Sequence, residues 1–65
     1  MTYYLISDYW AERKHWRTVG MTNSVAHAKA FASRDGIVTA HTFEEADQIH
    51  RTRVLPASAL ERIVA

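Results

Sequence analysis

The stretch TYYLISDYW, residues 2–10, followed by AERKHWRTVGM, residues 11–21, decides the fold of this chain. Residues 2–10 are rich in aromatic and β-branched side chains, and alternation places apolar residues on both sides of a strand near its start. Residues 16–21 predict a second strand. Because neither Gly nor Asn marks a tight two-residue turn between them, residues 11–15 are predicted to form a longer hairpin loop.

The next segments predict a helix and a third strand. Residues 25–33 are dense in alanine, which favours a helix, and Asn23 or Ser24 is suited to accept its first free amide hydrogens. Gly36 is predicted to close the helix in a turn with positive φ. Residues 37–41 then read as a strand.

A capping box marks the start of a second helix. The Thr42 hydroxyl is placed to accept an amide hydrogen, and the Glu45 carboxylate, three residues later, reaches back to the start of the helix. The helix is predicted over residues 43–51. After it, residues 53–55 predict a short fourth strand, and Ser58 is the expected cap of a final helical turn.

This order of elements predicts a single α+β domain over residues 1–65. We expect a small, single-layer, mostly antiparallel sheet with two to three short helices on one face. The other sheet face would then be uncovered and free for a partner. The hydrophobic centre is predicted to hold Leu5, Val25, Ala28, Phe31, Ile37, Phe43, Ala46 and Ile49.

Composition limits how the domain is stabilised and where it works. A chain of 65 residues buries only about 60% of its unfolded surface, and without cysteine it has neither disulfides nor thiolate metal sites. No apolar run approaches the ~18 residues of a membrane span, and the start lacks a signal-peptide pattern. We expect a soluble cytoplasmic protein, stabilised by packing alone or by a partner.

Catalytic and metal-binding patterns are not found in the sequence. No two histidines have the three- or four-residue spacing of a helical metal site, no serine lies in a glycine-flanked nucleophile turn, and capping explains the pair Glu44 and Glu45. We therefore expect neither an enzyme nor a need for a metal or cofactor. The histidines are His15, His27, His41 and His50.

The run RKHWR, residues 13–17, is the candidate functional feature, because it places cations and a large aromatic side chain between two strands. Arg and aromatic residues dominate binding interfaces. We expect Arg13, Lys14 and Arg17 to be exposed and to bind acidic side chains or phosphates. A neighbouring aromatic side chain would pack against the partner. The alternative is a solvated loop that binds no partner and whose charges only keep the domain soluble. The predicted partner-binding residues are Tyr9, Trp10, Arg13, Lys14, His15, Trp16 and Arg17.

The chain resembles, in size and style, the small accessory proteins of bacteriophages, among them anti-CRISPR proteins. The features that carry the resemblance are the aromatic strand at the start, the short helices and the helix start Thr42-Phe43-Glu44-Glu45-Ala46. It implies a non-enzymatic protein-binding module that inhibits a larger host complex, such as a CRISPR effector, by covering its nucleic-acid-binding surface. The partner would be a host protein or ribonucleoprotein complex in the host cytoplasm.

Two other functions fit the same residues. The first is a nucleic-acid-binding accessory or regulatory protein that uses residues 13–17, with weak and salt-sensitive binding because few cations are present. The second is a structural or assembly protein that forms a homodimer through the open face of its sheet.

Overall fold

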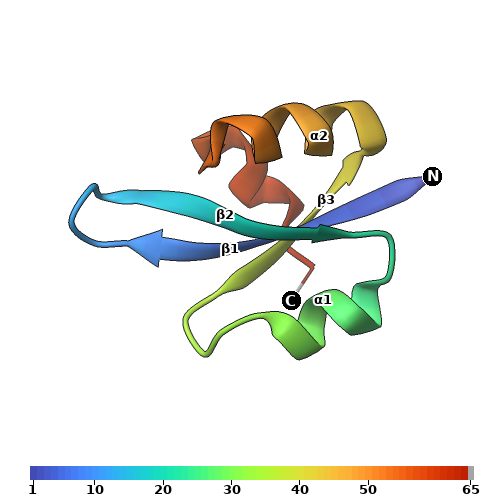
Figure 1. The fold of residues 1–65 in the computed structure, drawn as a ribbon, viewed down its shortest axis with the longest axis horizontal. Coiled ribbons are helices and arrows are strands. Elements are labelled where there is room, and N and C mark those ends of the chain that lie inside the picture. The colour runs from blue at the N-terminus through green and yellow to red at the C-terminus, as the bar shows by residue number, and fades with distance from the viewer. Residues whose placement is uncertain (65) are drawn as a thin grey trace.

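The computed structural model describes residues 1–64, and its centre is a four-stranded antiparallel sheet with the strand order β3-β1-β2-β4 (Figure 1). The first two strands, β1 (Thr2–Trp10) and β2 (His15–Thr22), form the predicted hairpin. The third strand, β3 (Ile37–Thr42), pairs with β1, and the short β4 (Val54–Leu55) pairs with β2. The predicted small α+β fold with an antiparallel sheet is confirmed.

Three short helical segments complete the fold: α1 (Val25–Phe31), α2 (Phe43–Thr52) and the 3-10 segment η1 (Ala57–Arg62). The Ser24 hydroxyl caps α1, because it accepts a hydrogen bond from the backbone N–H of His27 at 3.3 Å. Within residues 1–64, no helix is both long enough and apolar enough to cross a bilayer.

The two predicted caps after residue 40 have different outcomes. The capping box at α2 is confirmed, since Thr42 and Glu45 exchange both of the expected hydrogen bonds. The expected cap at Ser58 is wrong. Pro56 lies at the N-terminus of η1, and no side chain caps this segment. The proline ring fixes φ, and Pro56 has φ −67° and ψ 149°, an extended conformation that directly precedes the 3-10 turn.

The helices lie on both faces of the sheet, and the expectation that all of them share one face is wrong. Figure 1 shows α2 on one side of the sheet and α1 on the other. On the α2 face, Leu5 packs with Ala46 and Leu55. On the α1 face, Ile6 packs with Ala28. The predicted uncovered sheet face therefore does not exist.

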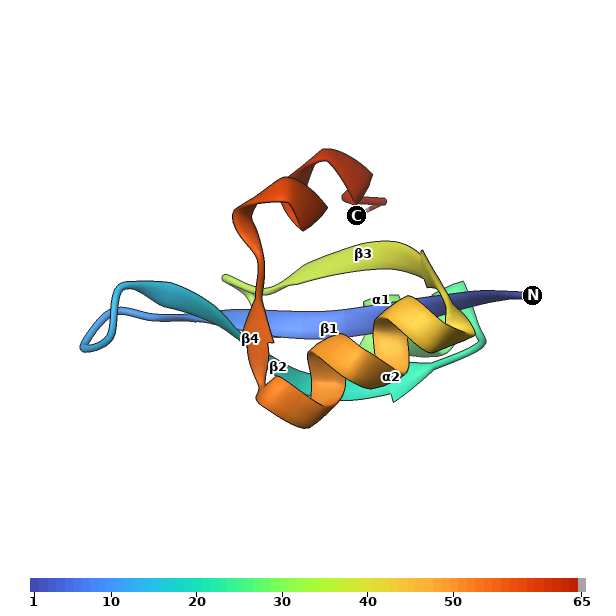
Figure 2. The ribbon, with the colours of Figure 1, turned by 90° about the horizontal axis from the view of Figure 1, so that it is seen from above.

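Strand order explains this placement. Because β2 and β3 both run antiparallel to β1, they are parallel to each other, and the chain must cross over β1 to connect them. The crossover is α1, which occupies one face of the sheet. Helix α2 carries the chain back from β3 to β4 and covers the face that α1 leaves free, as Figure 2 shows from above.

The predicted core is correct at its centre. Leu5, Ala28 and Ala46 are fully buried, and Ile37 and Ile49 pack against the core from partly buried positions. The remaining core residues, which were not predicted, are Ile6, Val38, Leu55 and Ala59.

The prediction that Val25, Phe31 and Phe43 lie in the core is wrong, because all three are exposed. Helix α1 contacts the sheet through the small side chains of Ala28 and Ala32, so its larger residues lie beside the contact rather than in it. Phe43 begins α2 at the end of the sheet. Its ring contacts the ring of Tyr3 in an edge-to-face arrangement, at a centroid distance of 5.0 Å.

Gly36 also differs from its prediction, because neither glycine has positive φ. Glycine is needed at this position for space instead. A Cβ atom on Gly36 would lie 2.8 Å from Asp8 Oδ1 and 3.0 Å from the backbone nitrogen of Ser33.

The two edges of the sheet are covered by different segments of the chain. Beside β3, Ile63 forms an antiparallel bridge with Thr39, and the Val64 N–H donates to the Val38 carbonyl at 2.8 Å. The chain after η1 thus covers part of that edge. At the other edge, β4 pairs with only two of the eight residues of β2.

Candidate partner-binding surface

The predicted contact residues lie on an arm, residues 9–17, that extends beyond the helices (Figures 1 and 2). A turn over residues 11–14 closes the arm, in which the Arg13 N–H donates to the Trp10 carbonyl at 3.1 Å. Lys14 ends the turn with a φ of 55°, in the left-handed region. Four-residue loops are common hairpin connections, so the prediction of a longer loop is confirmed, although His15 lies on β2 and not in the loop.

Three cationic or titratable side chains converge on the indole of Trp10, and we name these four residues the cationic cluster. The guanidinium carbons of Arg17 and Arg13 lie 4.8 Å and 5.3 Å from the indole centroid. The His15 ring meets the same indole edge-on at 5.6 Å. Both guanidinium groups are within the distance at which a cation is attracted to an aromatic face.

Strand register builds the cluster. Trp10 pairs with His15 across the hairpin, and Arg17 pairs with Asp8, so Trp10 and Arg17 are diagonal neighbours on one face of the sheet. Diagonal pairs lie within reach of long and aromatic side chains. The arrangement gives the arginines a defined orientation before any partner binds.

Within residues 1–64, no ion pair involves the cations of the arm. The two ion pairs of this part of the chain join Arg51 to Asp47 and Arg62 to Glu45, away from the arm. Asp8 faces Arg17, but its Oδ1 accepts a hydrogen bond from the Ser33 hydroxyl at 2.6 Å. The Nε atom of Arg17 is buried and has no hydrogen-bond acceptor.

The other face of the arm carries Tyr9 and Trp16, whose rings meet edge-to-face at 5.4 Å. Trp16 packs against the core that contains Leu55, while Tyr9 remains half-exposed. The seven predicted residues therefore do not form one patch. Trp16 contributes to folding, and the cations gather on the opposite face around Trp10.

Exposure also corrects part of the prediction. Arg13 and Lys14 are exposed, as expected, but Arg17 is half-buried. The register of the hairpin decides which aromatic residue the arginines meet. That register depends on the length of the loop, which the composition of residues 11–15 does not specify.

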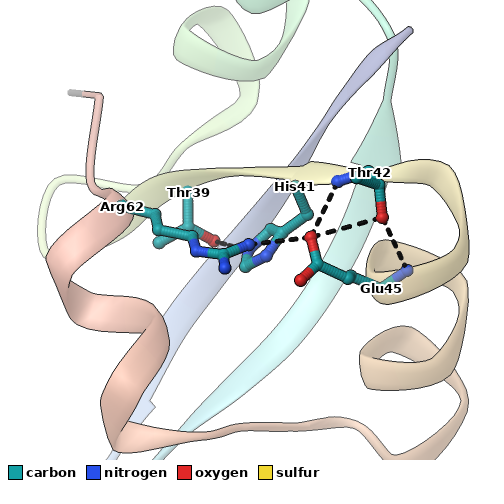
Figure 3. A network of polar contacts seen from close by, with 5 residues as sticks. All are labelled: Thr39, His41, Thr42, Glu45 and Arg62. Atoms are coloured by element: carbon teal, nitrogen blue, oxygen red, sulfur yellow. Dashed lines mark hydrogen bonds and ion pairs between the residues drawn. The ribbon is translucent and has the colours of Figure 1, made fainter.

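A second group of polar side chains joins β3, α2 and η1 (Figure 3). Glu45 Oε1 accepts hydrogen bonds from the Thr42 N–H at 3.0 Å and from Arg62 Nη1 at 2.7 Å. His41 is buried beside this pair, with its Nε2 2.8 Å from the Thr39 hydroxyl oxygen. The group ties the C-terminal segment to the sheet.

The electrostatics of this second group fit a structural role. The hydrogen bond from the Thr42 backbone, followed by the bond from Arg62, lowers the pKa of Glu45 to about 2. Burial, and then the charge of Arg62, lower the pKa of His41 below its ordinary value, against the opposing effect of Glu45. Glu45 is therefore ionised and His41 neutral near pH 7.

These pKa shifts predict acid-sensitive folding. As the pH falls below 6.5, His41 in the unfolded chain takes up a proton before the folded His41 does, so the free energy of unfolding decreases. Glu45 adds a second decrease between pH 4.5 and about 2. Urea titrations at a series of pH values measure both.

The variant His41→Gln should remove the decrease that begins below pH 6.5, whereas His27→Gln, at an exposed histidine, should retain it. If His41→Gln keeps the full decrease, the buried histidine is not its source.

The histidines come from four different elements, since His15 lies on β2, His27 on α1, His41 on β3 and His50 on α2. In the described part of the chain, no three His, Asp or Glu side chains form a group suited to a metal ion.

Acidic residues gather at the other end of the molecule. Glu44 and Glu45 lie in the first turn of α2, which Figure 1 places near the N-terminus of the chain and away from the arm. The cations of the arm are therefore separated along the molecule from the acidic residues of α2, of which Glu45 is paired with Arg62.

No protein-family model, curated protein or solved structure matches this chain. The geometry of the arm is therefore the feature that points to a candidate function.

Proposed function

We propose that this chain is a non-enzymatic protein-binding module that uses the arm to bind an acidic surface of a larger complex. The observation that carries the proposal is the cationic cluster, in which Arg13 and Arg17 lie over the Trp10 indole, with no carboxylate of residues 1–64 within ion-pair distance. A group of cations that form no ion pair within the described residues, on a projecting arm, favours binding to an anionic partner.

The orientation of the arginines supports a specific contact. A flexible arginine loses rotamer freedom when it binds, at a cost of about 0.5–1.5 kcal/mol for each immobilised side chain. The indole of Trp10 already restricts Arg13 and Arg17, so less freedom is left to lose. Their remaining N–H groups are suited to paired hydrogen bonds with carboxylates.

The aromatic rings favour protein over nucleic acid as the partner. Binding to single strands relies on aromatic faces on which bases stack. The Trp10 face is already engaged by guanidinium groups, and Trp16 is engaged by Tyr9 and by the core. With three cations, and with both Trp rings already in contact with other side chains, the arm is better suited to acidic side chains.

The resemblance to phage accessory proteins gives the proposal its specific form, an inhibitor of a host complex such as a CRISPR effector. Channels that bind nucleic acid are basic, so the arm would bind an acidic surface beside the channel. The body of the domain would then cover the nucleic-acid-binding surface, and one copy would inhibit one complex.

The test changes the charge of the arm without disturbing the sheet. Arg13 and Lys14 are exposed and can become glutamate, but Arg17 is half-buried opposite Asp8, where a carboxylate would be repelled. The variant is therefore Arg13→Glu/Lys14→Glu/Arg17→Gln. It should keep the circular dichroism spectrum of the parent and stay folded at the temperature of the binding assay, since exposed charges contribute only about 0–1 kcal/mol each to folding and each guanidinium–indole contact about 0.5–1 kcal/mol.

The binding assay uses tagged protein in nuclease-treated bacterial lysate, followed by titration of the purified captured complex. We expect the arm variant to lose binding by about 100-fold or more, because like-charge contact costs several kcal/mol. The control Lys29→Glu/Arg34→Glu/Arg53→Gln changes the net charge equally and should bind like the parent. Equal binding by the arm variant would contradict the proposal. Tight, steeply salt-dependent binding of an oligodeoxythymidylate by the parent would show a nucleic-acid-binding protein instead.

A further inference from the structure

The open part of the β2 edge is a second surface, separate from the arm. Strand β4 pairs with Trp16 and Arg17 of β2, and the Thr18 N–H donates to the Arg53 carbonyl. Beyond this point, Val19–Thr22 has no strand partner on the side away from β1 within residues 1–64. A free row of backbone donors and acceptors is a template for another strand.

This edge is short and begins with a β-bulge, but it has no charged side chain, no proline and no covering segment to prevent pairing. Natural proteins protect edge strands with Lys, with Pro or with a covering segment. The sequence of the open edge is Val19-Gly20-Met21-Thr22, which is uncharged and contains no proline. The opposite edge is partly covered, by Ile63 and Val64.

A register shift occurs at the beginning of the open edge. Ile6 pairs with Gly20 whereas Ser7 pairs with Thr18, so Val19 is an extra residue that forms a β-bulge. The Val19 side chain is 45% exposed. Bulges re-aim side chains and are treated as features of a fold rather than defects.

A hollow of about 370 Å³ follows this edge and has α1 as its wall. It is lined from both faces of the sheet, by Ile6 and Gly20 on the α1 face and by Met21 on the α2 face. Two side chains of α1, His27 and Phe31, complete the lining. We name this hollow the edge groove.

The edge groove has features that suit contact with a copy of itself. It presents a hollow beside a protruding apolar side chain, since Phe31 is 75% exposed. In a two-fold contact the same patch faces itself, so each Phe31 can fill the hollow of the other copy. The lining carries no Lys, Arg, Asp or Glu, so identical patches meet without like-charge repulsion.

We propose that the open β2 edge is the site at which two copies of this chain pair antiparallel, with Phe31 of each copy packed into the edge groove of the other. The pairing joins two four-stranded sheets into one and covers the exposed Val19 and Phe31. The pairing uses residues 19–22 and not the arm, residues 9–17, so the proposal does not depend on the function assigned to the arm.

The test measures the dimer dissociation constant by sedimentation equilibrium. Val19→Lys places two like charges at the paired edge and should weaken the dimer by about 100-fold or more. Val54→Lys is the matched control, because Val54 is 44% exposed on β4, outside the edge groove, compared with 45% for Val19. It should dimerise like the parent, as should the arm variant.

Amide hydrogen exchange of the parent chain gives a second measurement that does not depend on a variant. Amides within Val19–Thr22 should become more protected as protein concentration rises, while amides in the arm turn should not change. A parent chain that sediments as a monomer at about 1 mM would overturn the proposal. Equal dissociation constants for the two lysine variants would also overturn it. A third contrary result would be protection of the Val19–Thr22 amides by a different protein but not by a second copy of this chain.

Discussion

Leu5→Ala should lower the melting temperature of the domain by at least about 10 °C, because a loss of 1 kcal/mol shifts small domains by about 4–8 °C. Leu5 is fully buried at the centre of the sheet and packs with Ala46, Leu55 and Ala59. Truncation of such a side chain costs about 2–5 kcal/mol, as lost transfer energy and as a cavity. A chain of 65 residues has a total stability of only about 3–10 kcal/mol.

The matched control is Phe31→Ala, which removes a larger side chain from an exposed position. It should cost less than about 1 kcal/mol in dilute, monomeric protein. Urea denaturation followed by circular dichroism measures both variants. Equal losses would show that Phe31 is buried in solution and that α1 packs on the sheet in a different orientation.

Gly36→Ala should lower the free energy of unfolding by about 1–3 kcal/mol, although it adds only one methyl group. The new Cβ atom would lie 2.8 Å from Asp8 Oδ1, 3.0 Å from the Ser33 backbone nitrogen and 3.0 Å from the Ser33 hydroxyl oxygen. The alanine would therefore separate Ser33 from Asp8 or shift the turn between α1 and β3. Loss of stability in thermal and urea unfolding is the expected result.

Gly20→Ala tests whether the effect is specific to Gly36. Its Cβ atom would meet only the Ile6 side chain, with the nearest atom, Cδ1, at 3.3 Å, and this end of a flexible side chain can move aside. Gly20→Ala should cost less than Gly36→Ala. The reverse order would mean that the turn at Gly36 adapts more easily than the sheet does.

The candidate site illustrates which part of a binding surface a sequence contains. The run RKHWR is visible as a basic stretch between two strands, and the exposure of Arg13 and Lys14 follows from their place in a hairpin loop. Its division into two faces is not visible. Trp10 and Trp16 have the same chemistry, and only the pairing of β1 with β2 places the arginines beside Trp10.

The sequence by itself determined the features that depend on neighbours in the chain. The strand β1, the Ser24 cap and the capping box of Thr42 and Glu45 arise from side-chain alternation and from hydrogen bonds across three residues. Such interactions form within a single segment, whatever the rest of the chain does.

Only the tertiary structure decided the features that join distant segments. Composition does not specify that β3 lies beside β1, and this strand order makes α1 a crossover and puts α1 and α2 on opposite faces. It also buries Val38 while Phe31 stays exposed, and leaves Val19–Thr22 open at the sheet edge. Burial and edge exposure depend on which surfaces meet in space, whereas hydrophobicity along the chain records only which side chains are suited to be buried.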